Sequence, residues 1–248
     1  PEVFANDGGF DVMCGNPPWD KLQMEEEKWF IGKDNDIVKA ANQNERKRKI
    51  AALEYTDPSL FNEFISAGKG IASQSSFVKQ SGRFPLTSVG KLELSSLFAE
   101  LCLSFSKEAW GLVLPTGIAV NDSNKAFFSK LIDENRLMSL YDFENKEALF
   151  DIHRMFKFCL LTAGKEQPQP RTVKGGFYLT RLDHLLDPKR VYSLRTSDFC
   201  LLNPNTKTCP VFRTSRDAAL TAKIYRNSEI IFNEKTNKNP WNVTFGSM

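Results

Sequence analysis

The sequence predicts an α/β protein built on a mixed β-sheet with an antiparallel hairpin at one edge. An apolar stretch, 10–14, ends at a rigid proline turn, and helical and strand patterns alternate from residue 94 onward. Two strand-like stretches, 137–143 and 156–163, then follow each other with no helix between them. Strands linked through a helix run parallel, whereas directly linked strands pair antiparallel.

The first predicted strand, 10–14, ends where the next residues cannot continue it. Pro17 and Pro18 have fixed φ angles and no backbone N–H groups. Pro17 also disfavours the helical region for Asn16. Open α/β sheets bind ligands at the carboxyl ends of their strands, so we expect the corner 15–19 to be the binding site.

Between this corner and residue 91, the sequence predicts helices followed by an irregular stretch. Apolar residues spaced among charges indicate helices over 29–53. The run Glu-Arg-Lys-Arg-Lys at 45–49 is either a solvated helix face or a face that contacts phosphate. Glycine and proline interrupt 56–91, which we expect to be irregular.

From residue 94 the pattern is regular again. A strand at 111–114 ends at Pro115, and Asp122 or Ser123 is expected to cap the next helix. The buried side of that helix is predicted to be Ala126, Phe127, Leu131 and Ile132. The helix before the strand presents one apolar face made of Leu94, Leu97, Phe98, Leu101, Cys102 and Phe105.

A segment rich in glycine and proline, 164–176, indicates a boundary. We therefore expect one domain at 1–165 and an irregular extension at 166–248. Within the extension, short strands are predicted at 177–182 and 191–194, and a helix is predicted to begin at Ser215.

The composition is that of an ordinary soluble globular protein. Of 248 residues, 41% are hydrophobic and 25% are charged. No apolar run approaches the ~20 residues of a membrane span, and the first residues do not resemble a signal peptide. A net charge of +3 permits a nucleic-acid partner without requiring one. Five scattered cysteines and two histidines favour reduced thiols, a cytoplasmic location and no metal site.

The proline corner has the chemistry to bind a flat base that carries an exocyclic amino group. The side-chain oxygen of Asn16 and the carbonyl oxygen of Pro17 can accept the two N–H bonds of such an amine. The ring of Trp19 can stack on the face of the base.

Asn-Pro-Pro-Trp at 16–19, after an apolar strand, resembles the catalytic motif of amino-methyltransferases, which read Asn/Asp/Ser-Pro-Pro-Tyr/Phe/Trp. The segments 97–100, 111–117 and 141–151 follow in an order and spacing similar to the gamma-order DNA adenine-N6 methyltransferases, in particular the large restriction–modification or phage-defence methylases. The resemblance implies the second half of a Rossmann-like S-adenosylmethionine methyltransferase sheet. It also makes 1–165 a partial methyltransferase domain, and 166–248 a linker and the start of a target-recognition region.

The resemblance assigns catalysis to Asn16, Pro17, Pro18 and Trp19. The target adenine would leave the duplex, because its amino group cannot be reached inside the helix. Further roles implied for single residues are base stacking for Phe150, cofactor contact for Phe98, and contact with DNA for His153 and Arg154. For Trp19, Phe98 and Phe150 the alternative is ordinary core packing, and for His153 and Arg154 it is a solvated loop.

The implied cofactor is S-adenosylmethionine and the implied partner is double-stranded DNA. The family's Phe-x-Gly-x-Gly loop and the acidic residue for the cofactor ribose precede the catalytic motif, so we expect them upstream of Pro1 and expect this chain alone to be inactive. We also expect the strand 10–14 to be an exposed apolar edge that permits homo-oligomers.

Two other functions remain open from the sequence. The corner also suits RNA or a glutamine side-chain amide, and a non-catalytic module that binds DNA or protein could retain the same fold.

Overall fold

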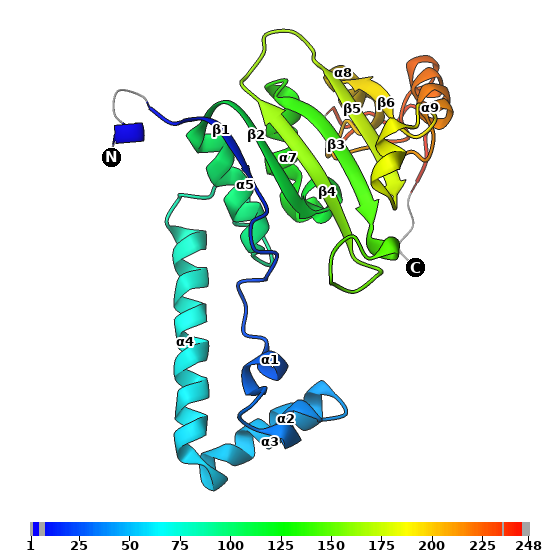
Figure 1. Ribbon diagram of the computed structural model, residues 1–248. Helices are drawn as coiled ribbons and strands as arrows, with labels where there is room; N and C mark the ends of the chain where they lie inside the picture. Colours follow the sequence, from blue (N-terminus) through cyan, green and yellow to red (C-terminus); the bar gives the residue numbers. More distant parts are fainter. Residues whose placement is uncertain (1, 5–7, 235, 245–248) are drawn as a thin grey trace. The chain divides into compact units, whose positions relative to one another are not determined.

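The structure, a computed structural model, describes residues 2–4, 8–234 and 236–244. By their contacts, the residues form two compact units. We call Asp20–Glu93 the helical unit, and Pro1–Trp19 together with Leu94–Met248 the sheet unit. Both units are drawn in Figure 1.

The helical unit consists of four helices around a small apolar core. Phe30, Ile37, Ile50 and Leu53 form this core. Asp34, Asn42 and Asp57 cap the later three helices through their side-chain oxygens. The helices are α1 (Glu26–Phe30), α2 (Asn35–Val38), α3 (Gln43–Thr56) and α4 (Pro58–Gln80).

The expectation of an irregular stretch at 56–91 is wrong over most of its length, because α4 occupies 23 of these residues. The cap at Asp57 and a proline in the first turn start this helix. Gly68 and Gly70 lie within it, although each lowers helix propensity by about 1 kcal/mol. Glycine content therefore misled the local prediction.

The sheet unit contains a six-stranded mixed sheet, and this confirms the predicted α/β fold class. The strands lie in the order β1-β2-β4-β3-β5-β6 (Figure 1). Four of them, β1, β2, β3 and β5, run in one direction, and β4 and β6 run in the other. Their bounds are β1 (Phe10–Gly15), β2 (Ser106–Pro115), β3 (Leu137–Glu144), β4 (Lys157–Gly164), β5 (Thr172–Leu179) and β6 (Tyr192–Arg195).

The hairpin of β3 and β4 forms as predicted, but it does not lie at the edge of the sheet. Strand β4 inserts between β2 and β3, and β5 pairs with the free side of β3. Residues beyond 165 therefore extend the sheet instead of forming an irregular extension. The chain also does not divide at residue 165 by its contacts, because the second compact unit is Asp20–Glu93.

Strand β1 is an edge strand, as expected. It pairs only with β2 among the described strands, and Val12 and Phe10 on it are 65% and 41% exposed. An apolar strand with one unpaired side can pair with another strand.

The helices of the sheet unit supply most of its core. Phe127 and Phe128 of α7 and Phe199 of α8 are fully buried. Two predictions for α7 are corrected: Phe128 is buried in place of Ala126, and Asp122 and Ser123 form a short 3-10 turn instead of a cap. The helices are α5 (Leu94–Phe105), α6 (Gly117–Val120), α7 (Lys125–Asp133), α8 (Thr196–Leu202) and α9 (Ser215–Asn227), with 3-10 turns η1 (Glu2–Phe4), η2 (Asp122–Asn124), η3 (Asn145–Glu147) and η4 (Leu182–Leu186).

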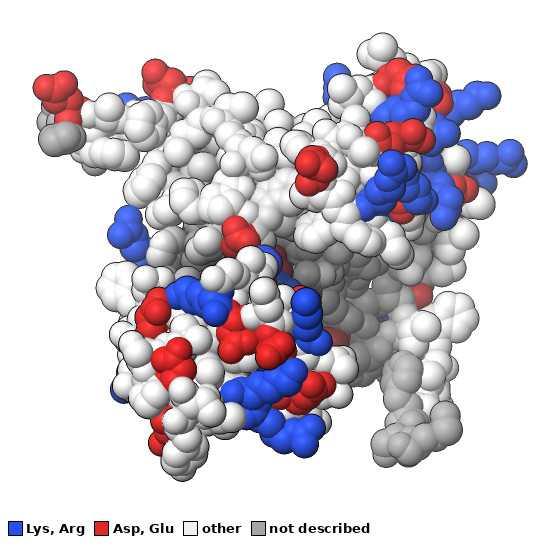
Figure 2. Space-filling view, turned by 60° about the horizontal axis from the view of Figure 1, so that its bottom comes forward, with Lys and Arg blue, Asp and Glu red and all other residues white. Residues whose placement is uncertain are grey.

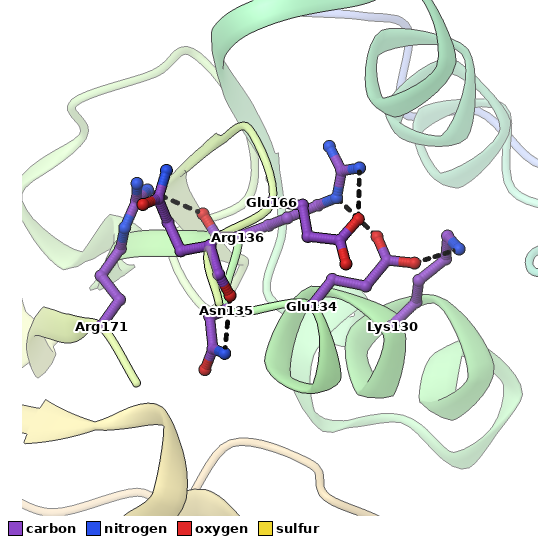
Figure 3. Close-up of polar contacts among 7 residues, drawn as sticks. Lys130, Glu134, Asn135, Arg136, Glu166 and Arg171 are labelled. Atoms are coloured by element: carbon purple, nitrogen blue, oxygen red, sulfur yellow. Dashed lines mark hydrogen bonds and ion pairs between the residues drawn. The ribbon is translucent and has the colours of Figure 1, made fainter. Parts of the chain in front are cut away.

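A polar network fixes the end of the sheet where β3 and β5 begin (Figure 3). Glu134 lies 2.5 Å from both Lys130 and Arg136. Burial works against ionisation of Glu134, but these two cations lower its pKa below the usual value. Arg136 also approaches Glu166 at 3.8 Å, and Arg171 donates to the Arg136 carbonyl at 3.4 Å.

Among the described residues, no helix has the length and apolar character that a membrane span requires. The same residues contain no group of three or more His, Cys, Asp or Glu side chains able to hold a metal ion. All five cysteines are free thiols.

Candidate functional site

The carboxyl end of β1 opens directly into the proline corner. The Asn16 side chain is exposed and Pro17 is half-buried. Both border an open cavity of about 220 Å³, whose other side is formed by Phe98 and Cys102 of α5 and Leu112 of β2. The structure therefore brings Asn16, Pro17 and Phe98 together.

Two hydrogen-bond acceptors at this corner are free. Within the described part of the chain, neither the Asn16 side chain nor the Pro17 carbonyl has a hydrogen-bond partner. Pro18 follows them and brings no N–H group. The corner therefore presents two oxygens that can accept bonds from a ligand.

Trp19 lies beside this corner in an aromatic cluster and is half-buried. Its indole N–H donates to the carbonyl oxygen of Val113 on β2 at 3.2 Å. The ring centroid of Phe150 is 5.7 Å away in an edge-on arrangement. Phe156 and Phe158 stack nearly parallel to the indole at 6.0 and 6.1 Å.

The aromatic cluster is larger than the sequence predicted. The resemblance implies that Trp19 and Phe150 both stack on the base, whereas Phe156 and Phe158 belong to the strand predicted at 156–163. Phe156 directly precedes β4 and Phe158 lies in it, and their spacing of two residues was the available signal, because alternate residues of an extended chain share a face.

The loop that joins β3 to β4, residues 145–156, carries Phe150 and is organised by a buried asparagine. Asn145 is fully buried. Its side-chain N–H groups donate to the carbonyls of Phe150 and Ile152, both at 3.0 Å. Its side-chain oxygen accepts the Phe150 N–H, also at 3.0 Å. Sequence reasoning missed Asn145, although asparagine after a strand often bonds to nearby backbone.

His153 and Arg154 lie on the same loop and are exposed. His153 Nδ1 accepts the N–H of Met155 at 3.3 Å. The Arg154 guanidinium donates to the carbonyl of Lys146 at 3.4 Å. These contacts shape the loop, and contact of either side chain with DNA stays a prediction.

A buried carboxylate ties three strand ends together behind the site. Asp142 of β3 is 2% exposed. It accepts hydrogen bonds from the Thr116 hydroxyl at 2.5 Å and from the Tyr178 N–H at 3.4 Å. Burial raises the pKa of Asp142 above its usual value. Tyr178 has a left-handed φ of 58°, at a register shift between β3 and β5.

The basic side chains near Tyr178 and Glu144 are paired with a carboxylate or lie over an aromatic ring. Lys157 and Arg213 lie over the ring of Tyr178 at 4.7 and 4.5 Å. Lys157 also pairs with Glu144 at 3.2 Å, and Lys146 pairs with the same carboxylate. On the face drawn in Figure 2, lysine and arginine side chains are interspersed with aspartate and glutamate. On this face, contact with a polyanion would therefore depend on individual lysine and arginine side chains and not on a continuous basic patch.

The residues around the cavity fit only part of S-adenosylmethionine. The cavity of about 220 Å³ is smaller than the ~300–1,000 Å³ of typical small-molecule sites. Phe98 is 43% exposed and can lie against a flat ring. Among the residues that line the cavity there is no carboxylate to bind ribose hydroxyls. This cavity alone is therefore too small, and lacks the groups, to hold the whole cofactor.

No family model matches the chain, and no curated protein matches it. Among solved structures, the chain is similar to the type I restriction-modification system methyltransferase subunit from Streptococcus thermophilus, with 13% identity and a TM-score of 0.38 over 56% of this chain and 35% of that chain. It is also similar to the type IIG restriction endonuclease BpuSI, with 18% identity and a TM-score of 0.38 over 72% of this chain and 16% of that one.

A third similar structure is the ATP-dependent Type ISP restriction-modification enzyme LlaBIII bound to DNA, with 10% identity and a TM-score of 0.33 over 67% of this chain and 10% of that one. The chain thus spans about a third of the first of these proteins and less of the others. These likenesses are partial, so the function has to be inferred from the residues of the site.

Proposed function

We propose that this chain carries the base-binding part of a DNA methyltransferase that modifies the exocyclic amino group of a flipped adenine. The observation that carries the proposal is the open corner, where Asn16 and Pro17, whose acceptor oxygens are unpaired, border a cavity. Trp19 follows two residues later in the chain. A restriction–modification or phage-defence system is the setting that the sequence resemblance implies.

Asn16 and Pro17 activate the amino group in this proposal. The amino nitrogen of adenine is a weak nucleophile, because its lone pair is delocalised into the ring. Hydrogen bonds to the Asn16 side-chain oxygen and the Pro17 carbonyl favour a pyramidal nitrogen with a localised lone pair. The same two oxygens stabilise the positive charge that develops on nitrogen, which is electrostatic preorganisation.

The aromatic cluster offsets the cost of extracting the base. Unpairing and unstacking an adenine costs a few kcal/mol, whereas stacking on an aromatic side chain contributes about 1–3 kcal/mol per base. Trp19 is held in place by its bond to Val113 and by Phe150, so little side-chain freedom is lost when the base arrives.

S-adenosylmethionine, when bound, supplies the electrophilic methyl group. Phe98 is the residue of this chain that would contact it, across the cavity from Asn16. Because the cavity lacks a carboxylate for the ribose, we expect this chain alone to bind the cofactor weakly.

The proposal is tested by Asn16→Ala introduced at the native locus, with N6-methyladenine mapped by long-read sequencing. Loss of one preorganised hydrogen bond costs about 10²–10³-fold in rate, so the protein-dependent marks should disappear. Asn62→Ala, an exposed asparagine on α4, is the matched control and should leave the marks intact.

Other outcomes separate the alternatives. Methyl groups lost from RNA or from protein glutamine, with DNA unchanged, would support a different amine substrate. Marks that persist both in Asn16→Ala and after deletion of the gene would leave a binding module without catalysis.

A further inference from the structure

The loop between β3 and β4 exposes large apolar side chains next to the proline corner. Every residue from 151 to 156 is exposed. Met155 is 82% exposed, Phe156 44% and Ile152 38%. Exposed apolar groups that gather on one short loop often mark an interaction site.

This loop is held in a fixed shape by its own hydrogen bonds. Asn145 bonds to the backbone of Phe150 and Ile152. The N–H of Phe156 donates to the His153 carbonyl at 2.9 Å, and the N–H of Ile152 donates to the Phe150 carbonyl at 2.9 Å. Because the backbone is tied inward at these points, Met155 is presented to solvent on a turn that is already formed.

The residue just before the exposed stretch and its last residue both contact Trp19, the proposed base-stacking residue. The rings of Phe150 and Phe156 lie 5.7 and 6.0 Å from that of Trp19. Met155 is the residue before Phe156, and the exposed Arg154 precedes it. The loop therefore combines an apolar tip, a neighbouring cation and direct attachment to the corner.

We propose that Met155 enters double-stranded DNA beside the target adenine and fills the space that the flipped base leaves in the stack. Proteins that distort DNA insert apolar side chains, methionine among them, between base steps. An unbranched, polarisable thioether adapts to such a gap. Arg154, one residue earlier, would contact a phosphate and fix the register of the loop. This inference rests on the proposed function.

The experiment uses the full-length protein that the native gene encodes. It compares the wild type with the variants Met155→Ala and Met155→Leu. The probes are pools of random-sequence duplexes that carry one 2-aminopurine opposite either thymine or an abasic site. Rising 2-aminopurine fluorescence reports the extracted base, and methylation of matching adenine duplexes is measured in parallel. Leu220→Ala, at a leucine of α9 that is 56% exposed, is the control, and thermal unfolding checks that each variant folds.

Met155→Ala should open the paired base about tenfold less than the wild type, which corresponds to about 1.4 kcal/mol. It should equal the wild type when the opposite position is abasic, because the pairing that holds the target base in the stack is then already lost. Met155→Leu and Leu220→Ala should behave like the wild type on both probes. Such rescue by the abasic probe would not follow from a merely structural defect.

Two results would overturn the inference: Met155→Ala opening the paired base normally, or losing the same factor on both probes. A loop that instead binds a partner protein would give the first result. The proposed function fails separately, if the wild type opens the base and no methyl group reaches DNA under any condition. If Met155→Ala leaves methylation unchanged, the proposed function stands, but the proposed insertion of Met155 into DNA is wrong.

Discussion

Removing the Asn145 side chain should destabilise the sheet unit more than removing a comparable buried asparagine. Asn145 is fully buried, and its amide makes three hydrogen bonds of 3.0 Å to the backbone of Phe150 and Ile152. Asn145→Ala breaks all three at once. It also frees the segment that holds Phe150 against Trp19.

The expected loss follows from the number of bonds. Each hydrogen bond contributes about 1 kcal/mol net, and a buried partner left unsatisfied costs about 1–3 kcal/mol. Ile152 is 38% exposed, so its carbonyl can be hydrated after the substitution, whereas the Phe150 groups are half-buried. We therefore expect Asn145→Ala to lower the free energy of unfolding by about 3 kcal/mol.

Urea unfolding measures this loss, and Asn124→Ala is the matched control. Asn124 is 3% exposed and its amide makes one hydrogen bond, to the Gly117 carbonyl at 3.1 Å. It should lose only about 1 kcal/mol. Hydrogen exchange should localise the Asn145 effect to residues 145–156. Equal losses in the two variants would refute the reasoning that three bonds organise the loop.

Three further predictions concern stability and association. Burial raises the pKa of Asp142 above its ordinary value of 3.8, so the contribution of this carboxyl to stability is complete below that value and is lost as pH rises through the folded-state pKa. Urea unfolding from pH 4 to 8 should show Asp142→Asn gaining stability relative to the wild type. Gly164→Ala would place a Cβ 2.8 Å from the Arg171 guanidinium and 3.2 Å from two further atoms, and should cost about 1–3 kcal/mol of stability. Gly70→Ala in α4, whose Cβ would have nothing within 4 Å, should instead gain about 0.5–1 kcal/mol. Thermal melts that rank the two variants in the opposite order would contradict the packing described. Val12→Lys puts a charge on the exposed strand β1 and should abolish strand-mediated self-association, which light scattering would reveal as a lower mass than that of the wild type at the same concentration.

The end of β1 at the proline corner was predictable because local chemistry dictates it. Two prolines end β1 wherever the strand lies in the sheet. The hairpin of β3 and β4 was predictable for a similar reason, since directly linked strands pair with each other. The position of β4 between β2 and β3 was not, because strand order depends on contacts between residues far apart in the chain.

Two residue-level failures have the same origin. Gly68 and Gly70 suggested a loop, yet the Asp57 cap and the helical periodicity around them prevail. Asn145 read as an ordinary polar residue after a strand, because its burial arises only once the loop 145–156 closes over it. Local preference describes each residue in isolation, whereas burial is set by the rest of the fold.

Strand order also explains why the corner acquires its aromatic cluster. Phe158 of β4 pairs with Pro115 of β2 on one side and with Phe143 of β3 on the other. With β4 at the edge of the sheet, Phe158 could not have both neighbours. In its observed place it stacks on Phe143 at 5.3 Å and approaches Trp19 at 6.1 Å.

The side-chain hydrogen bonds near the carboxyl ends of the central strands link one strand to another. Trp19 bonds to the β2 carbonyl of Val113, and Asp142 of β3 binds Thr116 after β2 and the Tyr178 N–H of β5. A change in the pairing of β2, β3 or β4 would therefore shift Trp19 relative to Asn16. The geometry that we propose for base binding is thus a property of the central strands, and substitutions in their pairing should impair the site as strongly as substitutions in the corner.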